Sequence, residues 1–326
     1  MSTLASVFAV FHPPIFEVPQ TRGDYNILVT PRASTSPLHA WILAFRPRTL
    51  FAAAAPVAVG TAVAIRDGGF ALLPALAALL GALLLQVGSN LANDVFDFQR
   101  GADAPDRVGP LRVTQSGLLT PAQVLRGMWV VFALSLIPGL YLAARGGWPV
   151  VAIGIAAIAA AVLYTGGPLP YGYKGMGEIF VFVFFGLVAV SGTYYVQTNT
   201  LTLLAIAASV PVGLLTSAIL VVNNLRDIGP DRAVGKTTLA VLLGARGTRI
   251  EYLLLLGLAF AAPPALFAAG LAPPWVMIAW ISAPLAERQA RIVITQSGAA
   301  LNAALAGTAQ LTLAFSLLFA AGLTVQ

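Results

Sequence analysis

The chain has 326 residues and a formal net charge of +6, and 58% of its residues are hydrophobic while only 9% are charged. A soluble domain carries about 25% charged residues, so this composition excludes a water-soluble globular protein and indicates a membrane protein. In a membrane protein, an excess of Lys and Arg more often marks the cytoplasmic face than a nucleic-acid-binding surface. We therefore expect no nucleic-acid partner.

The residue inventory also limits the chemistry. The chain has no cysteine, and both histidines, His12 and His39, precede its apolar part. Disulfides, iron–sulfur clusters, thiolate zinc sites, His-ligated haem and catalysis by a buried histidine are therefore excluded. A metal in the apolar part needs oxygen ligands, which favours Mg²⁺, Ca²⁺ or Mn²⁺.

Residues 1–36 are polar, contain proline and show no periodicity. The apolar stretch Leu4–Phe11 is too short for a secretory signal and has no basic residue before it, so we predict no signal peptide. We expect a flexible cytoplasmic tail, with a start codon assigned too early as the alternative. Residues 37–326 are expected to form one transmembrane domain.

From residue 37 onward, the apolar residues fall into roughly nine blocks, each close to the ~20 residues that cross a bilayer core as a helix. The pattern predicts an all-α membrane protein with about nine transmembrane helices. The predicted spans are 46–65, 70–92, 123–143, 148–165, 176–197, 201–222, 250–270, 273–294 and 299–323.

The basic residues predict the orientation of these spans. One side of the membrane receives the segment before the first span and those after the second, fourth, sixth and eighth spans. That side then holds 16 of the 18 Lys and Arg residues, and only Arg66 and Arg145 lie opposite. The positive-inside rule therefore places the N-terminus in the cytoplasm and the C-terminus outside.

Six of the twelve acidic residues fall in two motifs, at 90–106 and 223–236. Each motif begins at the cytoplasmic end of a long span, one after the second span and one after the sixth. The number of spans between them is even, so both motifs are expected on the same face, where they can meet.

The spacing within each motif predicts a cation site. Asp94 and Asp97 are three residues apart and Asp227 and Asp231 are four apart, so each pair shares a helix face. Mg²⁺ typically takes one or two carboxylates and completes its shell with phosphate oxygens and water. Solvated loops are the alternative, but they leave the paired carboxylates beside repeated asparagines unexplained. The basic residues within and beside the motifs would donate hydrogen bonds to phosphate oxygens. They are Arg100, Arg107, Arg112, Arg226, Arg232 and Lys236.

With other short motifs in the same order and spacing, these residues resemble the UbiA superfamily of intramembrane prenyltransferases over nearly all of 41–323. The resemblance is closest to the branch that prenylates 1,4-dihydroxy-2-naphthoate. Gly101 stands where the superfamily usually has a third Asp, and that branch shares the shift to Asp103. The motifs lie at 46–50, 93–103, 106–110, 113–117, 164–168, 175–178, 192–195, 223–236 and 301–302.

The resemblance implies a bundle of about nine helices around a central cavity, with both acidic motifs over its cytoplasmic mouth, in the cell inner membrane. It implies transfer of a polyprenyl group from polyprenyl diphosphate to 1,4-dihydroxy-2-naphthoate, which releases diphosphate and CO₂ and gives demethylmenaquinone. The implied cofactor is Mg²⁺. The expected catalytic residues and metal ligands are Asp94, Asp97, Asp227 and Asp231.

The expected substrate-binding residues surround these four carboxylates. The superfamily's Tyr-x-x-x-Lys element would place a lysine at 168, where this chain has Pro168, and Lys174 is the candidate to replace it. A boundary role competes with substrate binding for Arg46, and an interfacial role for Tyr164. The full set is Asn90, Asn93, Asp103, Arg46, Arg107, Asn223, Asn224, Arg226, Lys236, Tyr164 and Lys174.

Three alternatives remain open from the sequence. The first is prenyl transfer to another acceptor, such as 4-hydroxybenzoate, homogentisate or haem, or phytyl transfer to the naphthoate. The second is a CDP-alcohol phosphotransferase, whose Asp-Gly-x-x-Ala-Arg pattern is absent here. The third is an ion-coupled transporter, although transporter charges usually lie at the bilayer midplane, whereas these lie at span ends.

Overall fold

The computed structural model describes residues 36–102 and 108–325, and within these ranges every regular element is helical. The predicted tail at 1–36 lies almost wholly outside the described residues. In the described part, seven helical segments are long and apolar enough to cross a membrane. The chain is an integral multi-pass membrane protein with the predicted all-α fold. The seven segments are Pro37–Arg66, Leu72–Gln99, Pro121–Gly146, Gly177–Thr198, Leu203–Arg226, Leu239–Ala268 and Gly298–Thr324.

Some of these segments combine several elements. The first joins α2 (Pro37–Phe45), a short 3-10 turn and α3 (Leu50–Arg66), and the fourth joins α7 (Gly177–Val181), a π-helical stretch and α8 (Ala189–Thr198). The seventh joins a 3-10 turn (Gly298–Ala300) to α13 (Leu301–Thr324). The others are α4 (Leu72–Gln99), α5 (Pro121–Gly146), α9 (Leu203–Arg226) and α11 (Leu239–Ala268), which is kinked at Gly244.

Two of the nine predicted spans differ from the rest. The fourth is α6 (Trp148–Leu163), which is apolar but shorter than the others. The eighth is a 3-10 stretch, Pro274–Ser282, followed by α12 (Ala283–Thr295). α12 carries Glu287 and two arginines, which a long apolar helix would not tolerate. The predicted count of nine is therefore approximate.

Local sequence accounts for where the helices begin and how closely they pack. Thr120 and Gln123 form a reciprocal capping box at the start of α5, and Thr202 and Thr238 cap α9 and α11. Gly60 lets α3 approach α8, because a Cβ there would lie 2.4 Å from the carbonyl oxygen of Val190. Small residues at such crossings are typical of membrane helix packing.

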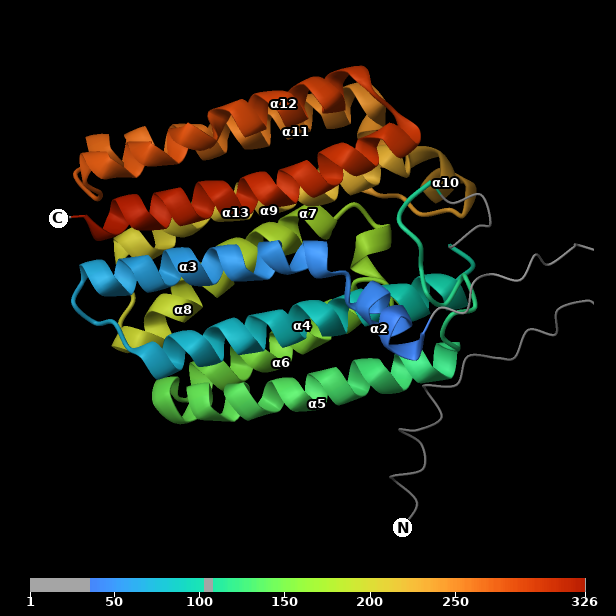
Figure 1. The fold of residues 1–326 in the computed structure, drawn as a ribbon, viewed down its shortest axis with the longest axis horizontal. Coiled ribbons are helices and arrows are strands. Elements are labelled where there is room, and N and C mark those ends of the chain that lie inside the picture. Colours follow the sequence, from blue (N-terminus) through green and yellow to red (C-terminus); the bar gives the residue numbers. More distant parts are fainter. Residues whose placement is uncertain (1–35, 103–107, 326) are drawn as a thin grey trace, which may run out of the picture. The chain divides into compact units, whose positions relative to one another are not determined.

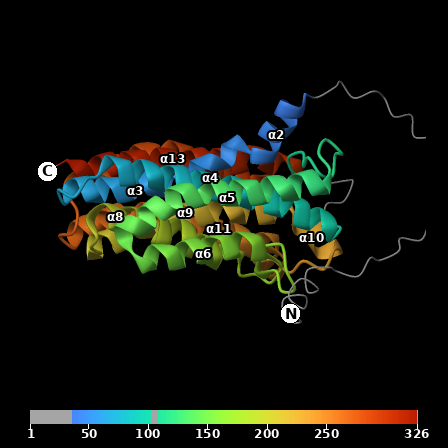
Figure 2. The ribbon, with the colours of Figure 1, turned by 90° about the horizontal axis from the view of Figure 1, so that it is seen from below.

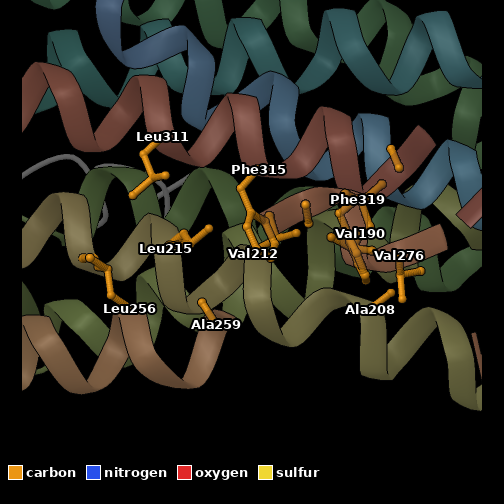
Figure 3. Close-up of a cluster of buried hydrophobic side chains, with 14 of the residues drawn as sticks. Val190, Ala208, Val212, Leu215, Leu256, Ala259, Val276, Leu311, Phe315 and Phe319 are labelled. Atoms are coloured by element: carbon orange, nitrogen blue, oxygen red, sulfur yellow. The ribbon is translucent and has the colours of Figure 1, made fainter. Parts of the chain in front are cut away.

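The helices run side by side in layers (Figure 1). α3, α9 and α13 lie centrally, with α11 and α12 on one side and α4, α5 and α6 on the other, and Figure 2 shows the same bundle turned by 90°. The main hydrophobic core lies among α3, α8, α9, α11 and α13 (Figure 3). Val212 and Leu215 of α9 and Phe315 and Phe319 of α13 belong to this cluster of buried side chains.

The C-terminal ends of α4 and α9 lie at the same end of this bundle, next to α2 and α10 (Ile228–Ala233). The opposite end carries the described C-terminus of the chain. The first acidic motif thus belongs to the last turns of α4, and the second spans the end of α9 and α10. The prediction that both motifs lie on one face is consistent with this arrangement.

Candidate active site

A cavity of about 910 Å³ opens inside the bundle beside the acidic motifs. Along α4 its lining runs from Ala78 to Asp97, which corresponds to roughly 28 Å of helix at 1.5 Å per residue. Most of its wall is aliphatic or aromatic, contributed mainly by α3 to α8. Its polar lining includes Arg46, Thr49, Gln86, Ser89, Asn90, Asn93, Asp97, Arg112, Tyr164, Tyr171, Asn223, Lys236 and Asn302.

Asp97 is buried at the polar end of this cavity and has two close partners. Arg112 lies 2.6 Å from one carboxylate oxygen, and the hydroxyl of Tyr173 donates to the other at 2.8 Å. Arg112 also donates to the backbone carbonyl of Asn93 at 2.5 Å, while Thr165 donates to the Asn93 side chain at 3.2 Å. The end of α4 is thus fixed by contacts from two separate loops.

Asp94 has a different environment, although it precedes Asp97 by only one helical turn. The backbone amides of Val113 and Thr114 donate to its two oxygens at 3.3 and 3.1 Å. The guanidinium of Arg46 lies 3.8 Å away, and only 1% of the Asp94 side chain is exposed.

In the second motif, Asp227 forms a buried two-point ion pair with Arg226, at 2.8 and 2.6 Å. Arg226 also donates to Asn223 and Asn302 at 2.8 and 2.9 Å. Its whole side chain is buried, so the guanidinium is held among oxygen acceptors at the junction of α9 and α13.

Asp231 follows on α10, with Lys236 at 3.4 Å from one of its oxygens. Its other oxygen, Oδ2, is buried without a hydrogen-bond partner among the described residues. Burial raises the pKa of the Asp231 carboxyl; Lys236 opposes this, and the nearby Asp227 adds to it. A cation bound at this point would restore a partner to Oδ2.

Tyr173 and Lys236 connect the two motifs. The Tyr173 hydroxyl donates to Asp97, and the Lys236 ammonium lies 5.0 Å from the centre of the Tyr173 ring while pairing with Asp231. Thr237 holds the Tyr173 carbonyl through both its backbone amide and its hydroxyl, at 3.0 and 2.7 Å. Burial, followed by the Asp97 charge, raises the pKa of Tyr173, which keeps its hydroxyl a donor. The motifs therefore meet, as the sequence predicts.

The remaining predicted residues fall into three groups. The structure brings Arg46, Asn90, Asn93, Tyr164, Asn223 and Lys236 to the cavity wall. Asn224 is instead buried against Glu178, to which it donates at 2.8 Å, and Lys174 is exposed. Asp103 and Arg107 lie outside the described residues.

One polar residue at the cavity, Gln86, escaped the sequence prediction. Gln86 donates to Thr49 and Asn90 at 3.3 and 3.2 Å, and it lies four residues before Asn90 on the same helix face. That spacing was a usable signal. Nothing in the local sequence distinguishes Tyr173, which contacts Asp97 across 76 positions, from the neighbouring tyrosines.

The donor set fits Mg²⁺. Every candidate ligand at the meeting point is a carboxylate or amide oxygen, and one of these, Asp231 Oδ2, lacks a partner in the described chain. Within the described ranges, no three acidic or histidine side chains are grouped closely enough to hold a metal unaided. Mg²⁺ suits such a site because it relies on phosphate oxygens and water for most of its shell.

Comparison with known proteins gives one consistent match. The model of the UbiA prenyltransferase family matches residues 53–314. The 1,4-dihydroxy-2-naphthoate octaprenyltransferase of Mycobacterium tuberculosis is 45% identical over 77% of this chain and 84% of its own length. The Escherichia coli protein of the same name is 41% identical over 87% and 94%.

The fold gives a match among solved structures as well. A UbiA homologue from Archaeoglobus fulgidus, solved with DMAPP and Mg²⁺ bound, superposes with a TM-score of 0.57. The alignment covers 88% of this chain and all of that one, at 16% sequence identity. At that identity the likeness concerns the fold.

Proposed function

The chain belongs to the UbiA prenyltransferase family, and we propose that it transfers a polyprenyl group from a polyprenyl diphosphate to 1,4-dihydroxy-2-naphthoate. Diphosphate and CO₂ leave, and the product is the reduced form of demethylmenaquinone. The observation that carries this proposal is the pair of relatives of that name, which align over most of this chain and of their own lengths.

The cavity supports the proposal because its two parts match the two parts of a prenyl diphosphate. The long aliphatic wall suits a polyprenyl tail, and the charged end suits a diphosphate. Lys236 and Arg112 line that end and supply ammonium and guanidinium donors for phosphate oxygens. An apolar tail with an anionic head therefore has one orientation in which both parts are satisfied.

Asp97, Asp227 and Asp231, together with the Asn93 and Asn223 amides, would hold Mg²⁺ at this end. When bound, Mg²⁺ neutralises charge on the diphosphate and makes it a better leaving group. The side chains on either side of the carboxylates, Lys236 and Arg112, orient the diphosphate so that its prenyl carbon points along the cavity.

The reaction requires no strong base. The bond from the first prenyl carbon to the bridging oxygen breaks, and its electron pair leaves with the diphosphate. A ring carbon of the naphthoate then forms the new carbon–carbon bond to the allylic cation. The proton lost there balances the proton that replaces the departing carboxyl group. The aliphatic walls keep water from the cation, which would otherwise be hydrolysed.

Arg46 is the residue best placed to bind the acceptor's carboxylate. It lines the cavity between the two α-helical parts of the first membrane segment, in a left-handed conformation with φ of 50°. Such a conformation is uncommon for a residue with a Cβ and often marks a functional constraint. Thr49 and Asn90, which hydrogen-bond each other at 2.8 Å, form the adjacent polar wall.

A product assay on membranes that contain the protein tests this function. 1,4-Dihydroxy-2-naphthoate or 4-hydroxybenzoate is offered with a polyprenyl diphosphate, with and without Mg²⁺. We expect Mg²⁺-dependent, decarboxylated prenyl naphthoquinol, which Asp97→Asn abolishes and Glu287→Gln, an exposed carboxylate on α12, leaves unchanged. Product from hydroxybenzoate alone would reassign the acceptor. If neither acceptor gave a prenylated product, the prenyltransferase hypothesis would be wrong and the transporter hypothesis would be favoured.

We also propose that the end carrying the acidic motifs faces the cytoplasm across the cell inner membrane. The basic residues support this, because only Arg66 and Arg145 fall at the opposite ends of the spans. Since the chain has no cysteine, single cysteines can report the orientation directly. A membrane-impermeant maleimide should label Arg145→Cys in intact cells and Ser297→Cys only after lysis, and the reverse pattern would refute the orientation.

A further inference from the structure

We propose that Asp94 is a positioning residue, which fixes the segment 112–119 against α4 so that Arg112 reaches Asp97, and that it is not a metal ligand. This inference rests on the proposed function, because the metal–diphosphate site is what Asp94 would help to position. It assigns Asp94 a role different from the one that the acidic motif predicts.

The partners of Asp94 are the first argument. Its two oxygens each accept a hydrogen bond from a backbone amide, that of Val113 or Thr114, and both bonds are buried. Each oxygen keeps a further lone pair, but only 1% of the Asp94 side chain is exposed, so a metal could reach it only by displacing one or both amides. The amides would then be left without acceptors, and buried orphan N–H groups are rare in folded proteins.

The packing of the segment is the second argument. Val113 is fully buried and Leu119 nearly so, and both belong to a hydrophobic cluster with Leu91 and Val95 of α4. The carbonyl of Val113 also accepts backbone hydrogen bonds from the amides of residues 118 and 119. The two donors are thus held in place from both sides, whereas a side-chain partner could rotate away.

The position of Arg112 is the third argument. It directly precedes the two anchored amides, and its guanidinium reaches both Asp97, at 2.6 Å, and the Asn93 carbonyl, at 2.5 Å. Asp94 therefore holds the backbone from which Arg112 extends, on the same two turns of α4 that Arg112 contacts. A shift of that backbone would move the Arg112 guanidinium, which lines the cavity.

The wild-type protein provides the first test, by hydrogen exchange in peptides that cover residues 112–119. Exchange is measured before and after addition of Mg²⁺ and inorganic diphosphate. We expect these amides to stay protected, or become more protected, on loading. Faster exchange on loading would mean that the metal takes Asp94 from the amides, and it would overturn the inference.

A double-mutant cycle provides the second test, with the affinity for inorganic diphosphate at saturating Mg²⁺ as its readout. If Asp94 acts through Arg112, then Asp94→Asn and Arg112→Gln each weaken diphosphate binding by about tenfold. The double variant then binds diphosphate no more weakly than the single variant with the lower affinity. If the fold-losses in affinity of the two single variants multiply in the double variant, Asp94 acts independently of Arg112, as a metal ligand would. Should Asp94→Asn not fold, Asp94→Ser, whose hydroxyl still accepts one backbone hydrogen bond, takes its place.

The outcomes separate the inference from the proposed function. If the wild-type protein binds no diphosphate with Mg²⁺, the proposed function fails and the inference fails with it. If diphosphate binds and Asp97→Asn abolishes binding, the function is supported. The exchange and the cycle then decide the role of Asp94 alone.

Discussion

The two acidic motifs occupy the same place at the ends of α4 and α9, yet they use their carboxylates differently. In the first motif, Asp94 is held by backbone amides and Asp97 by the side chains of Arg112 and Tyr173. In the second motif, both carboxylates pair with side chains, and Asp231 keeps one oxygen without a partner among the described residues.

The difference lies in how readily each carboxylate can exchange its partner for a metal ion. A carboxylate bound by buried backbone amides is committed to the fold, because moving it breaks hydrogen bonds that nothing else can satisfy. A carboxylate paired with a lysine can exchange that partner for a cation or a phosphate-bound metal at small cost. Asp94 is thus the anchored carboxylate of the site, and Asp231 is the one that can most readily take a new partner.

The largest expected effect is on stability, at the buried pair of the second motif. Asp227→Ala should leave the Arg226 guanidinium buried without its charge partner, which typically costs about 3–5 kcal/mol. Thermal melting in detergent measures this. Glu287→Ala, which breaks the exposed pair with Arg291 on α12, is the matched control and should cost less than about 1 kcal/mol. Equal melting temperatures for the two variants would contradict the assignment.

A large effect on activity with little effect on stability is expected at Asp231. Asp231→Asn keeps the shape of the side chain but removes the charge from the oxygen that lacks a partner. Prenyl transfer should fall by at least about 100-fold, the loss expected when a metal contact is weakened by several kcal/mol. Glu251→Gln on α11 is the control, since Glu251 also has a buried oxygen without a partner among the described residues but belongs to neither acidic motif. Retained transfer in Asp231→Asn would mean that the second motif is structural.

An intermediate effect is expected at the link between the motifs. Tyr173→Phe removes the hydrogen bond to Asp97 while keeping the ring under Lys236, so kcat/KM should fall by about tenfold. Tyr194→Phe removes a comparable hydrogen bond to Asp67, at the opposite end of the bundle, and should leave kcat/KM unchanged. If both variants lose activity equally, Tyr173 acts through general stability.

The smallest expected effect sharpens the same link. Thr237→Val removes one of the two hydrogen bonds that hold the Tyr173 carbonyl, and the backbone amide keeps the other. We expect roughly a two- to fivefold loss in kcat/KM. Thr237→Ser, which retains the hydroxyl, should behave like the wild type, and a loss in both variants would point away from this hydrogen bond.

The sequence predicted well whatever depends on apolar length and helical spacing. The all-α fold, the side-by-side placement of the two motifs and the cavity position of Asn93, Asn223 and Lys236 all follow from where long apolar blocks end. The predicted eighth span is helical from 274 to 295, but it begins as a 3-10 stretch after Pro273-Pro274 and carries Glu287, so it is not one of the long apolar helices.

The sequence could not assign partners across the bundle. Within one motif, Asp94 and Asp97 look equivalent, and only the path of the segment 108–119 shows that one accepts from backbone amides and the other from side chains. The same holds for Asn224, which the sequence places among the substrate-binding residues, whereas the packing of α7 pairs it with Glu178. Such assignments depend on loops whose course no local periodicity encodes.

The central claim is that both motifs form a single Mg²⁺–diphosphate site, and the affinity for inorganic diphosphate tests it most directly. It is measured at saturating Mg²⁺ for the wild type, Asp97→Asn, Asp231→Asn and the double variant. We predict that each single substitution removes most of the affinity and that the double variant is little worse, because the two carboxylates share one ligand. Losses that multiply, or a single variant that binds like the wild type, would contradict the claim.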